Sequence, residues 1–147
     1  MPNFLRFVLA VVLGFVLGSV VNMALILLSG QVIAPPVGAD VTTMEGLKAS
    51  LHLFEPKHFV FPFLAHALGT LVGAFVATLF VRGKSVVPAC IVGGLFLLGG
   101  IANVFMLPSP GWFNAVDLLL AYAPAAWIGY ALARRLQQGR PATGPRS

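Results

Sequence analysis

Long apolar runs alternate with short polar segments along most of the chain. Four of these runs are long enough to cross a bilayer, and they cover residues 7–29, 59–81, 86–107 and 113–133. A helix needs about 20 apolar residues to span the hydrocarbon core, because each residue adds only about 1.5 Å of length. The pattern therefore predicts an all-α membrane protein with four transmembrane helices. Pro124, inside the fourth run, is expected to kink that helix.

A polar insert, residues 30–58, separates the first two runs and contains the helix-breaking pair Pro35-Pro36. Further on, the sequence Thr42-x-x-Glu45 fits a capping box, and apolar residues then recur at helical spacing. We expect a short amphipathic helix over about residues 43–54. It would lie on the outer membrane surface or cap the bundle, between the first and second transmembrane helices.

The composition leaves little room for any other domain. Hydrophobic residues make up 59% of the 147-residue chain and charged residues only 9%, whereas soluble domains carry about 25% charged residues. Residues 1–136 are therefore assigned to one transmembrane domain. Residues 137–147 are rich in Gly, Pro and Arg, and we expect them to form a disordered basic cytoplasmic tail.

The basic residues indicate how the helices are oriented. If the helices alternate in direction, only Lys48 and Lys57 lie on one side, together with all the acidic residues. The other side carries the remaining basic residues: Arg6, Arg82, Lys84, Arg134, Arg135, Arg140 and Arg146. By the positive-inside rule, that side is cytoplasmic, and so are both termini. The net charge of +5 does not indicate nucleic acid as a partner, because the cations lie at helix ends rather than in a stripe interleaved with aromatic residues.

Strongly polar side chains interrupt the apolar runs at four places: Asn22, His66, Asn103 and Asp117. Such groups are costly in hydrocarbon, so they are expected to face protein or water. Each lies within about 10 Å of the outer end of its run, at about 1.5 Å per residue. We expect them to meet in a polar pocket that opens to the periplasmic side. There His66 and Asp117 would share a proton, since imidazole titrates near neutral pH, and the two asparagines would orient a small ligand or a water.

Glycines accompany these polar residues. Gly14 and Gly18 share a helical face with Asn22, and a similar glycine pair follows His66. Glycine lets neighbouring helices approach closely. Such faces would pack helices within the chain or pair two copies of it, so a homo-oligomer is one interpretation and a place in a larger membrane complex is another.

The outer loop supplies further titratable groups at the expected mouth of the pocket: Asp40, Glu45, His52, Glu55 and His58. A metal site built from histidines and one acid is one interpretation of this set. The spacing H-x2-E-x2-H matches no standard zinc motif, however, and Pro56 interrupts the helix that would align the ligands. The identity of any metal or cofactor is therefore left open.

A purely structural role is the simplest alternative for the intramembrane groups. Asn and His side chains often join transmembrane helices through hydrogen bonds that contribute about 1 kcal/mol each. Asp117, near a helix start, would also interact favourably with the helix dipole. Cys90 is the single cysteine, so it has no partner for a disulfide and is expected to be a buried structural thiol.

Three segments carry a resemblance to a known group of proteins: HFVFPFLAHALGT, PPVGAD and GGIANVFMLPSP. In these segments, and over nearly its whole length, the chain resembles a family of small uncharacterised bacterial four-span inner-membrane proteins. The resemblance implies residence in the bacterial inner (plasma) membrane, with the lipid bilayer as surroundings. It brings no established activity and no functional residue.

Three functional classes follow from these patterns. The first is a module that binds or transports a small ligand, a proton or a lipid headgroup in the outward-facing pocket. The second is a structural or accessory subunit of a larger membrane complex. The third is a membrane-embedded enzyme that modifies a lipid or a quinone with the histidine and carboxylate groups.

Overall fold

The structure, a computed structural model, describes residues 3–81 and 84–139, and within these ranges it consists of helices and connecting turns without a strand. Four helical segments are long and apolar enough to cross a membrane: Asn3–Val32, Pro56–Phe80, Val87–Met106 and Gly111–Gln138. A short helix lies between the first two. The predicted fold class, an all-α membrane protein with four transmembrane helices and one short intervening helix, is confirmed.

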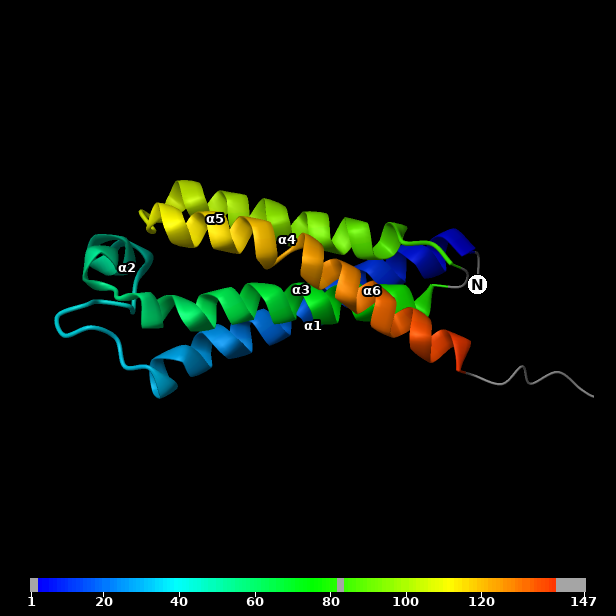
Figure 1. Cartoon of the computed structure of the whole chain (residues 1–147), viewed down its shortest axis with the longest axis horizontal. Coiled ribbons are helices and arrows are strands. Elements are labelled where there is room, and N and C mark those ends of the chain that lie inside the picture. The colour runs from blue at the N-terminus through cyan, green and yellow to red at the C-terminus, as the bar shows by residue number, and fades with distance from the viewer. Residues whose placement is uncertain (1–2, 82–83, 140–147) are drawn as a thin grey trace, which may run out of the picture.

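The helices form an elongated antiparallel bundle (Figure 1). In chain order they are α1 (Asn3–Val32), α2 (Met44–Ser50), α3 (Val60–Phe80), α4 (Val87–Met106), α5 (Gly111–Leu120) and α6 (Ala123–Gln138). Two 3-10 turns, η1 (Leu51–Leu53) and η2 (Pro56–Phe59), lead from α2 into α3. α3 packs along α1 and α6 and also contacts α4. We call the end that carries α2 the cap end, and the opposite end, where α1 begins, the basic end.

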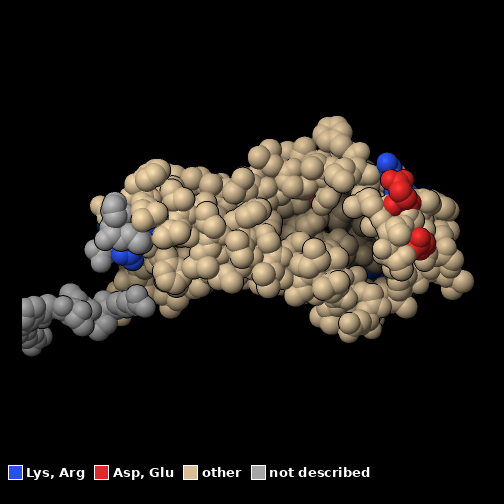
Figure 2. Space-filling model, turned by 180° about the vertical axis from the view of Figure 1, so that it is seen from behind, with Lys and Arg blue, Asp and Glu red and all other residues tan. Residues whose placement is uncertain are grey.

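Charged side chains lie toward the two ends of the bundle. On the face seen in Figure 2, acidic and basic atoms gather at the cap end, further basic atoms lie at the opposite end, and a broad uncharged belt separates them. Arg6 donates to the Phe80 carbonyl at 2.7 Å and Tyr130 donates to the Lys84 carbonyl at 3.1 Å, which places Arg6 and Lys84 at the basic end. Such a belt fits a chain that crosses a bilayer several times.

α1 and α3 approach each other at glycines. A Cβ atom on Gly14 would collide with the carbonyl oxygen of Gly73, and one on Gly18 would collide with the carbonyl oxygen of Gly69. Because glycine has no side chain, the two backbones come into direct contact at this crossing. These two glycine pairs therefore join helices within one chain.

The fourth transmembrane segment is broken rather than only kinked. α5 ends at Leu120 and α6 begins at Ala123, with Pro124 in its first turn. Proline lacks a backbone N–H, and its ring clashes with the carbonyl four residues earlier, so a continuous helix through this point is unfavourable. The break releases Tyr122 from regular helical spacing.

α6 is longer than the apolar run suggested and reaches Gln138. Gln137, which was expected in a disordered tail, donates from Nε2 to the carbonyl oxygens of Thr78 and Val81 at 3.1 and 3.2 Å. The prediction for this residue was wrong, because the last carbonyls of α3 lack partners in a further helical turn and accept a donor from a neighbouring helix. Gln138 and Gly139, also in the predicted tail, are the last residue and the C-cap of α6, and residues 140–147 lie outside the described residues.

The short helix differs from its prediction in length and in its N-cap. α2 covers Met44–Ser50, and Thr43 rather than Thr42 is the N-cap, with its hydroxyl accepting from the Gly46 N–H at 2.9 Å. The third helical position is then glycine, which has no side chain to complete a capping box, so Glu45 does not take that role. After Ser50 the backbone tightens into η1.

An apolar cluster closes the cap end. Leu51 of η1, Phe59 of η2 and Phe113 of α5 are buried together, and the ring centroids of Phe59 and Phe113 lie 4.7 Å apart. Partly buried side chains surround them: Leu47, Phe54, Phe63 and Leu107. The cluster therefore joins the cap to the ends of α3, α4 and α5.

Candidate functional site

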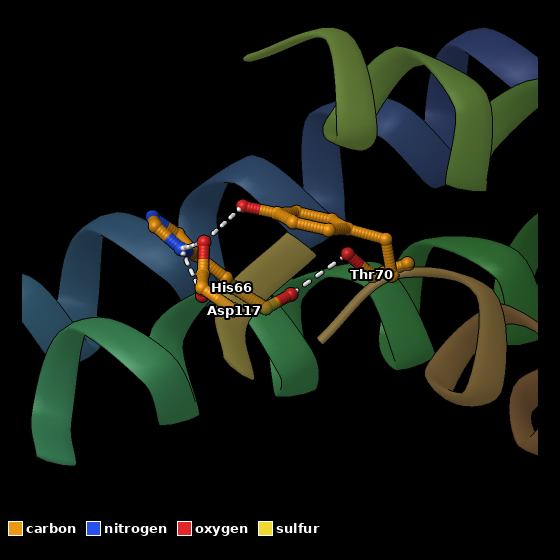
Figure 3. A network of polar contacts seen from close by, with 4 residues as sticks. His66, Thr70 and Asp117 are labelled. Atoms are coloured by element: carbon orange, nitrogen blue, oxygen red, sulfur yellow. Dashed lines mark hydrogen bonds and ion pairs between the residues drawn. The ribbon is translucent and has the colours of Figure 1, made fainter. Parts of the chain in front are cut away.

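An imidazole, a carboxylate and a phenol meet inside the bundle, in the half nearer the cap end. His66 lies six residues into α3 and Asp117 six residues into α5, which puts both about 9 Å from their helix starts. Nδ1 of His66 lies 2.8 Å from Oδ1 and 2.9 Å from Oδ2 of Asp117. The Tyr122 hydroxyl lies 2.8 Å from the same Oδ2. Figure 3 draws these contacts as dashed lines.

Tyr122 reaches Asp117 because the helix is broken between them. Residues five apart point to different sides of an unbroken α-helix, since 3.6 residues complete one turn. The break before α6 turns the phenol back toward α5. On α4, Gly100 leaves room for it, because a Cβ atom there would collide with the Tyr122 hydroxyl. The site therefore depends on α3, α4 and the α5–α6 break together.

The hydrogen-bond geometry indicates which ring nitrogen of His66 carries a proton. The Asp117 carboxylate accepts the Tyr122 hydroxyl, and because an ionised carboxylate can only accept, Nδ1 of His66 donates its N–H to it. In the neutral imidazole this leaves the lone pair on Nε2. Nε2 has no hydrogen-bond partner among the residues that the structure describes, and Figure 3 shows it turned away from Asp117.

The two hydrogen-bonded partners differ in their access to the surface. The Asp117 side chain is 5% exposed and the His66 side chain 14%, so the carboxylate is closed off while one edge of the imidazole remains accessible. The rings of His66 and Tyr122 stack, with centroids 5.8 Å apart and 28° between their planes. The Thr70 hydroxyl donates to the His66 carbonyl at 2.7 Å, so it does not compete for the ring. Together these contacts hold the imidazole in one orientation.

The two asparagines lie outside this network. Asn22 of α1 packs against Gly69, one turn along α3 from His66, and its Oδ1 is buried without a hydrogen-bond partner in the described part of the chain. Asn103 of α4 is exposed, and within residues 3–81 and 84–139 its side chain makes no hydrogen bond to the other three groups. The structure therefore brings together two of the four predicted site residues, His66 and Asp117.

Tyr122 is the site residue that the sequence prediction missed. Its spacing from Asp117 excludes a contact in a continuous helix. The signal that was present is Pro124, two residues later, since a kink at proline implies a local departure from helical spacing. A buried phenol needs a hydrogen-bond acceptor, so a tyrosine beside such a break is a candidate partner for an intramembrane carboxylate.

Three of the five predicted rim residues instead build the cap. Asp40 accepts from the backbone N–H and the hydroxyl of Thr42, at 2.9 and 2.6 Å. His58 is buried, with Nδ1 accepting from the Glu55 N–H at 2.9 Å and Nε2 donating to the Ala34 carbonyl at 3.2 Å. Glu55 completes a capping box with His58. These contacts join the loop after α1 to the start of α3 and leave His58 no free ring nitrogen.

The other two rim residues, Glu45 and His52, are exposed, and Nδ1 of His52 donates to the Ala49 carbonyl at 2.8 Å. Across the described ranges, no group of three or more His, Cys, Asp or Glu side chains is arranged to hold a metal ion. Cys90 is exposed rather than buried. That expectation was wrong because a polarisable thiol behaves as a small hydrophobe and is tolerated on an apolar surface as well as in a core.

Two carboxylates of the cap have lowered pKa values. The hydroxyl and the backbone N–H of Thr42 stabilise ionised Asp40 and hold its pKa below the ordinary value. Lys57, whose Nζ lies 2.8 Å from Oε2 of Glu55, lowers the pKa of Glu55 through a hydrogen bond and its charge. The cap therefore carries ionised carboxylates at neutral pH.

The fold and the site together define a multi-pass membrane protein with a hydrogen-bonded His–Asp–Tyr cluster inside the helix bundle. Comparison of the chain with protein-family models, with curated proteins and with solved structures finds no match. The family resemblance in the sequence stays a hypothesis, so function has to be argued from the geometry of this cluster.

Proposed function

We propose that this protein binds a small ligand or a proton at Nε2 of His66, in an intramembrane site near the periplasmic side of a bacterial inner membrane. The observation that supports the proposal is the pairing of His66 with Asp117, which together with Tyr122 holds the imidazole and leaves one nitrogen unpaired. A buried histidine with a purely structural role satisfies both nitrogens, as His58 does.

The proposed orientation follows from the distribution of charge. Arg6, Lys84 and Arg134 belong to the basic end, where Arg134 also bonds Gln137 at 2.6 Å. The acids other than Asp117 belong to the cap. Under the positive-inside rule the basic end and both termini are cytoplasmic, and the site then lies in the periplasmic half of the bilayer.

Occupancy of Nε2 changes the charge balance of the site. With a neutral imidazole the His66–Asp117 pair carries one negative charge, whereas a proton on Nε2 makes the pair neutral overall. A net charge at hydrocarbon depth is costly. A proton, or a ligand group that donates a hydrogen bond to Nε2, therefore offsets that cost. This is the chemistry expected of a proton or ligand site.

Acylation by diethyl pyrocarbonate, whose carbonyl carbon is attacked by an accessible imidazole lone pair, tests the proposal with the full-length protein in lipid nanodiscs. We expect His66 to be modified and His58 to resist, because both ring nitrogens of His58 are hydrogen bonded. Tandem mass spectrometry distinguishes the two residues. Modification at His52 with none at His66 would contradict the proposed site.

Asp117→Asn tests the orienting role of the carboxylate. The amide would donate to a ring nitrogen and so favour the tautomer that carries its N–H on Nε2. We expect acylation of His66 to fall about tenfold or more, since the lost charge-assisted hydrogen bond is worth about 1.5–3 kcal/mol. Glu45→Gln, at an exposed acid, is the control and should leave the rate unchanged. An unchanged rate in Asp117→Asn would show that the carboxylate does not orient the ring.

A membrane-embedded enzyme that modifies a lipid or quinone is a second candidate, and one observation favours it. A carboxylate that orients an imidazole while its other nitrogen stays free is also the arrangement of a general base. Turnover of a lipid or quinone extract that is lost in His66→Gln would support this role over binding alone.

A further candidate function is that of an accessory subunit in a larger membrane complex, which a small chain with four transmembrane helices would suit. Purification from native membranes as a lone species of one or two protomers would argue against it.

A further inference from the structure

A crevice opens between α1 and α4 in the cap half of the bundle. Nearer the middle the two helices touch, since the ring of Phe96 lies 5.4 Å from the ring of Phe15 and also lies beside Gly18. Gly99 and Asn103 follow Phe96 by three and seven residues and share its side of α4. Both are nevertheless exposed, and a Cβ atom on Gly99 would meet nothing within 4 Å. Figure 2 shows the molecule hollowed in this half.

The site of His66 lies at the bottom of this crevice. On the α1 side, Asn22 packs against Gly69, which lies one turn along α3 from His66. On the α4 side, Tyr122 stacks on His66 and lies against Gly100. The imidazole therefore lies between residues of the two helices that border the opening.

The cap closes the crevice toward the aqueous phase. Leu51, Phe59 and Phe113 are buried over the ends of α3 and α5, and the hydrogen bond from His58 to Ala34 joins the loop after α1 to the start of α3. Large apolar side chains on α1 and α4 are exposed, as on surfaces that face lipid: Met23, Leu27, Leu98 and Phe105. An occupant consequently enters sideways, from the bilayer.

Two unpaired acceptors determine the polar end of such an occupant. Nε2 of His66 carries a lone pair, and Oδ1 of Asn22 is buried with no partner among the described residues. A hydroxyl group carries one donor, which can pair with either acceptor but not with both at once. A phosphate or carboxylate head is disfavoured, because Asp117 already supplies a negative charge and its partner is His66 rather than a lysine or arginine. The polar end is therefore a donor without negative charge, and a hydroxyl is the uncharged group that meets this requirement.

We infer that the crevice takes a membrane-dissolved amphiphile with an uncharged hydroxyl head, the chemistry that monoacylglycerols and long-chain alcohols share. Its hydroxyl bonds Nε2 of His66 and its chain lies between α1 and α4. This inference names the ligand class of the site proposed above and rests on that proposal. The depth agrees, since a head about 9 Å below the helix starts lies beneath the lipid headgroups, and the chain continues into the hydrocarbon.

Binding of 1-oleoylglycerol to the full-length protein, measured by native mass spectrometry from nanodiscs, tests the inference. Gly99→Leu fills the crevice, whereas Gly94→Leu is a matched control, because a Cβ at either glycine meets nothing within 4 Å but the two positions, five residues apart, lie on different faces of α4. We expect the wild type and Gly94→Leu to hold the probe. Gly99→Leu should lose at least about tenfold in affinity, which corresponds to about 1.4 kcal/mol.

Further probes distinguish a simple alcohol from a glycerol head as the group that is recognised. They also distinguish failure of the proposed ligand class from failure of the proposed site. Binding of oleyl alcohol as well as 1-oleoylglycerol assigns recognition to the hydroxyl itself, and binding of 1-oleoylglycerol alone assigns it to the glycerol head; both support the inference. Equal binding of oleate, or undiminished binding to Gly99→Leu, would overturn it. If His66 reacts with diethyl pyrocarbonate but no probe binds, the ligand class is wrong and the site stands. If His66 does not react, the proposed site itself fails.

Discussion

Asp117 accepts hydrogen bonds from His66 and Tyr122 at 2.8–2.9 Å, at a depth where an unpaired carboxylate would be very costly. The two donors have different consequences. Tyr122 offers only its hydroxyl, so its bond to the carboxylate uses its donor. His66 has a second nitrogen, and the bond to Asp117 directs that nitrogen away from the carboxylate. At the scale of single residues, the carboxylate therefore positions both donors, and the imidazole is the more accessible of the two paired groups.

Tyr122→Phe removes one hydroxyl while it keeps the ring that stacks on His66. We expect the free energy of unfolding to fall by about 1.5–3 kcal/mol, the usual range for a hydrogen bond to a charged group. Tyr130→Phe is the control, because its hydroxyl bonds a backbone carbonyl at the exposed basic end, and it should cost less. Unfolding by SDS in mixed micelles, followed by circular dichroism, compares them. Equal losses of unfolding free energy in the two variants would mean that the Tyr122 bond to Asp117 is no stronger than a bond to an exposed backbone carbonyl.

At the scale of elements, α4 uses its glycines in two ways. A Cβ atom on Gly93 would collide with Ala126 of α6, and one on Gly100 would collide with Tyr122. Gly94 and Gly99 instead face open space. The first two allow close packing of the broken fourth segment on α4, and Gly99 leaves the crevice open.

Gly100→Ala changes only α4, yet it should disturb the hydrogen bond between Tyr122 and Asp117. The added methyl group would displace the Tyr122 hydroxyl from Asp117, and overpacking of this kind costs about 1–3 kcal/mol of stability. Gly99→Ala, the neighbouring substitution, should be neutral or stabilising by up to about 1 kcal/mol, because alanine is the better helix former. The same SDS titration measures both. A stable Gly100→Ala with unaltered acylation of His66 would refute the packing of Tyr122 against α4.

The cap should loosen in acid. The pKa of Asp40 is lowered in the folded protein from its ordinary value of 3.8. Ionised Asp40 therefore stabilises the cap fully at pH values above 3.8, and this contribution is lost as the pH falls through the lowered pKa. Glu55, whose pKa is lowered by Lys57, acts in the same direction. Emission of Trp112, recorded after replacement of the other tryptophan, should change below about pH 4. Asp40→Asn should reduce the change, and an identical profile would contradict the role of Asp40.

At the scale of the whole molecule, the bundle is tight at its basic end and open at its cap end. Arg6 of α1 and Gln137 of α6 both donate to carbonyls at the end of α3, which ties three helices together. Toward the cap end, beyond the contact of Phe96 with Phe15, Gly99 of α4 faces open space, and the ribbons of α1 and α4 diverge (Figure 1). The site consequently lies at the bottom of a lateral opening rather than in a closed core.

Gln137→Ala should loosen the basic end. Its amide satisfies several carbonyls of α3, and loss of a net hydrogen bond typically costs about 1 kcal/mol. Gln138→Ala, at the exposed next residue, is the control and should be within about 0.5 kcal/mol of the wild type. Thermal unfolding in detergent micelles measures the difference. If the two variants melt alike, Gln137 does not hold the helices together.

Hydropathy was sufficient for the four transmembrane segments because burial of backbone polar groups in lipid forces a long apolar run to become a helix. It was less informative at the ends of elements. Gln137 looks like a tail residue until the unsatisfied carbonyls of α3 are placed beside it. Glu45 looks like a capping partner until Thr43 is seen to be the N-cap. A partner from a distant segment decided the first case, and the local choice of N-cap residue decided the second.

For the site, too, some features follow from the sequence and others only from the tertiary structure. The sequence by itself determined that His66 and Asp117 lie in the outer halves of apolar helices, about 10 and 6 Å below the ends of their runs, because depth follows from residue count and the cost of polarity in hydrocarbon from residue type. Only the tertiary structure decided that these two meet, that Tyr122 joins them across a helix break, and that Asn103 does not. Those outcomes depend on how helices rotate and separate against one another, and the packing of side chains from distant parts of the chain sets that rotation.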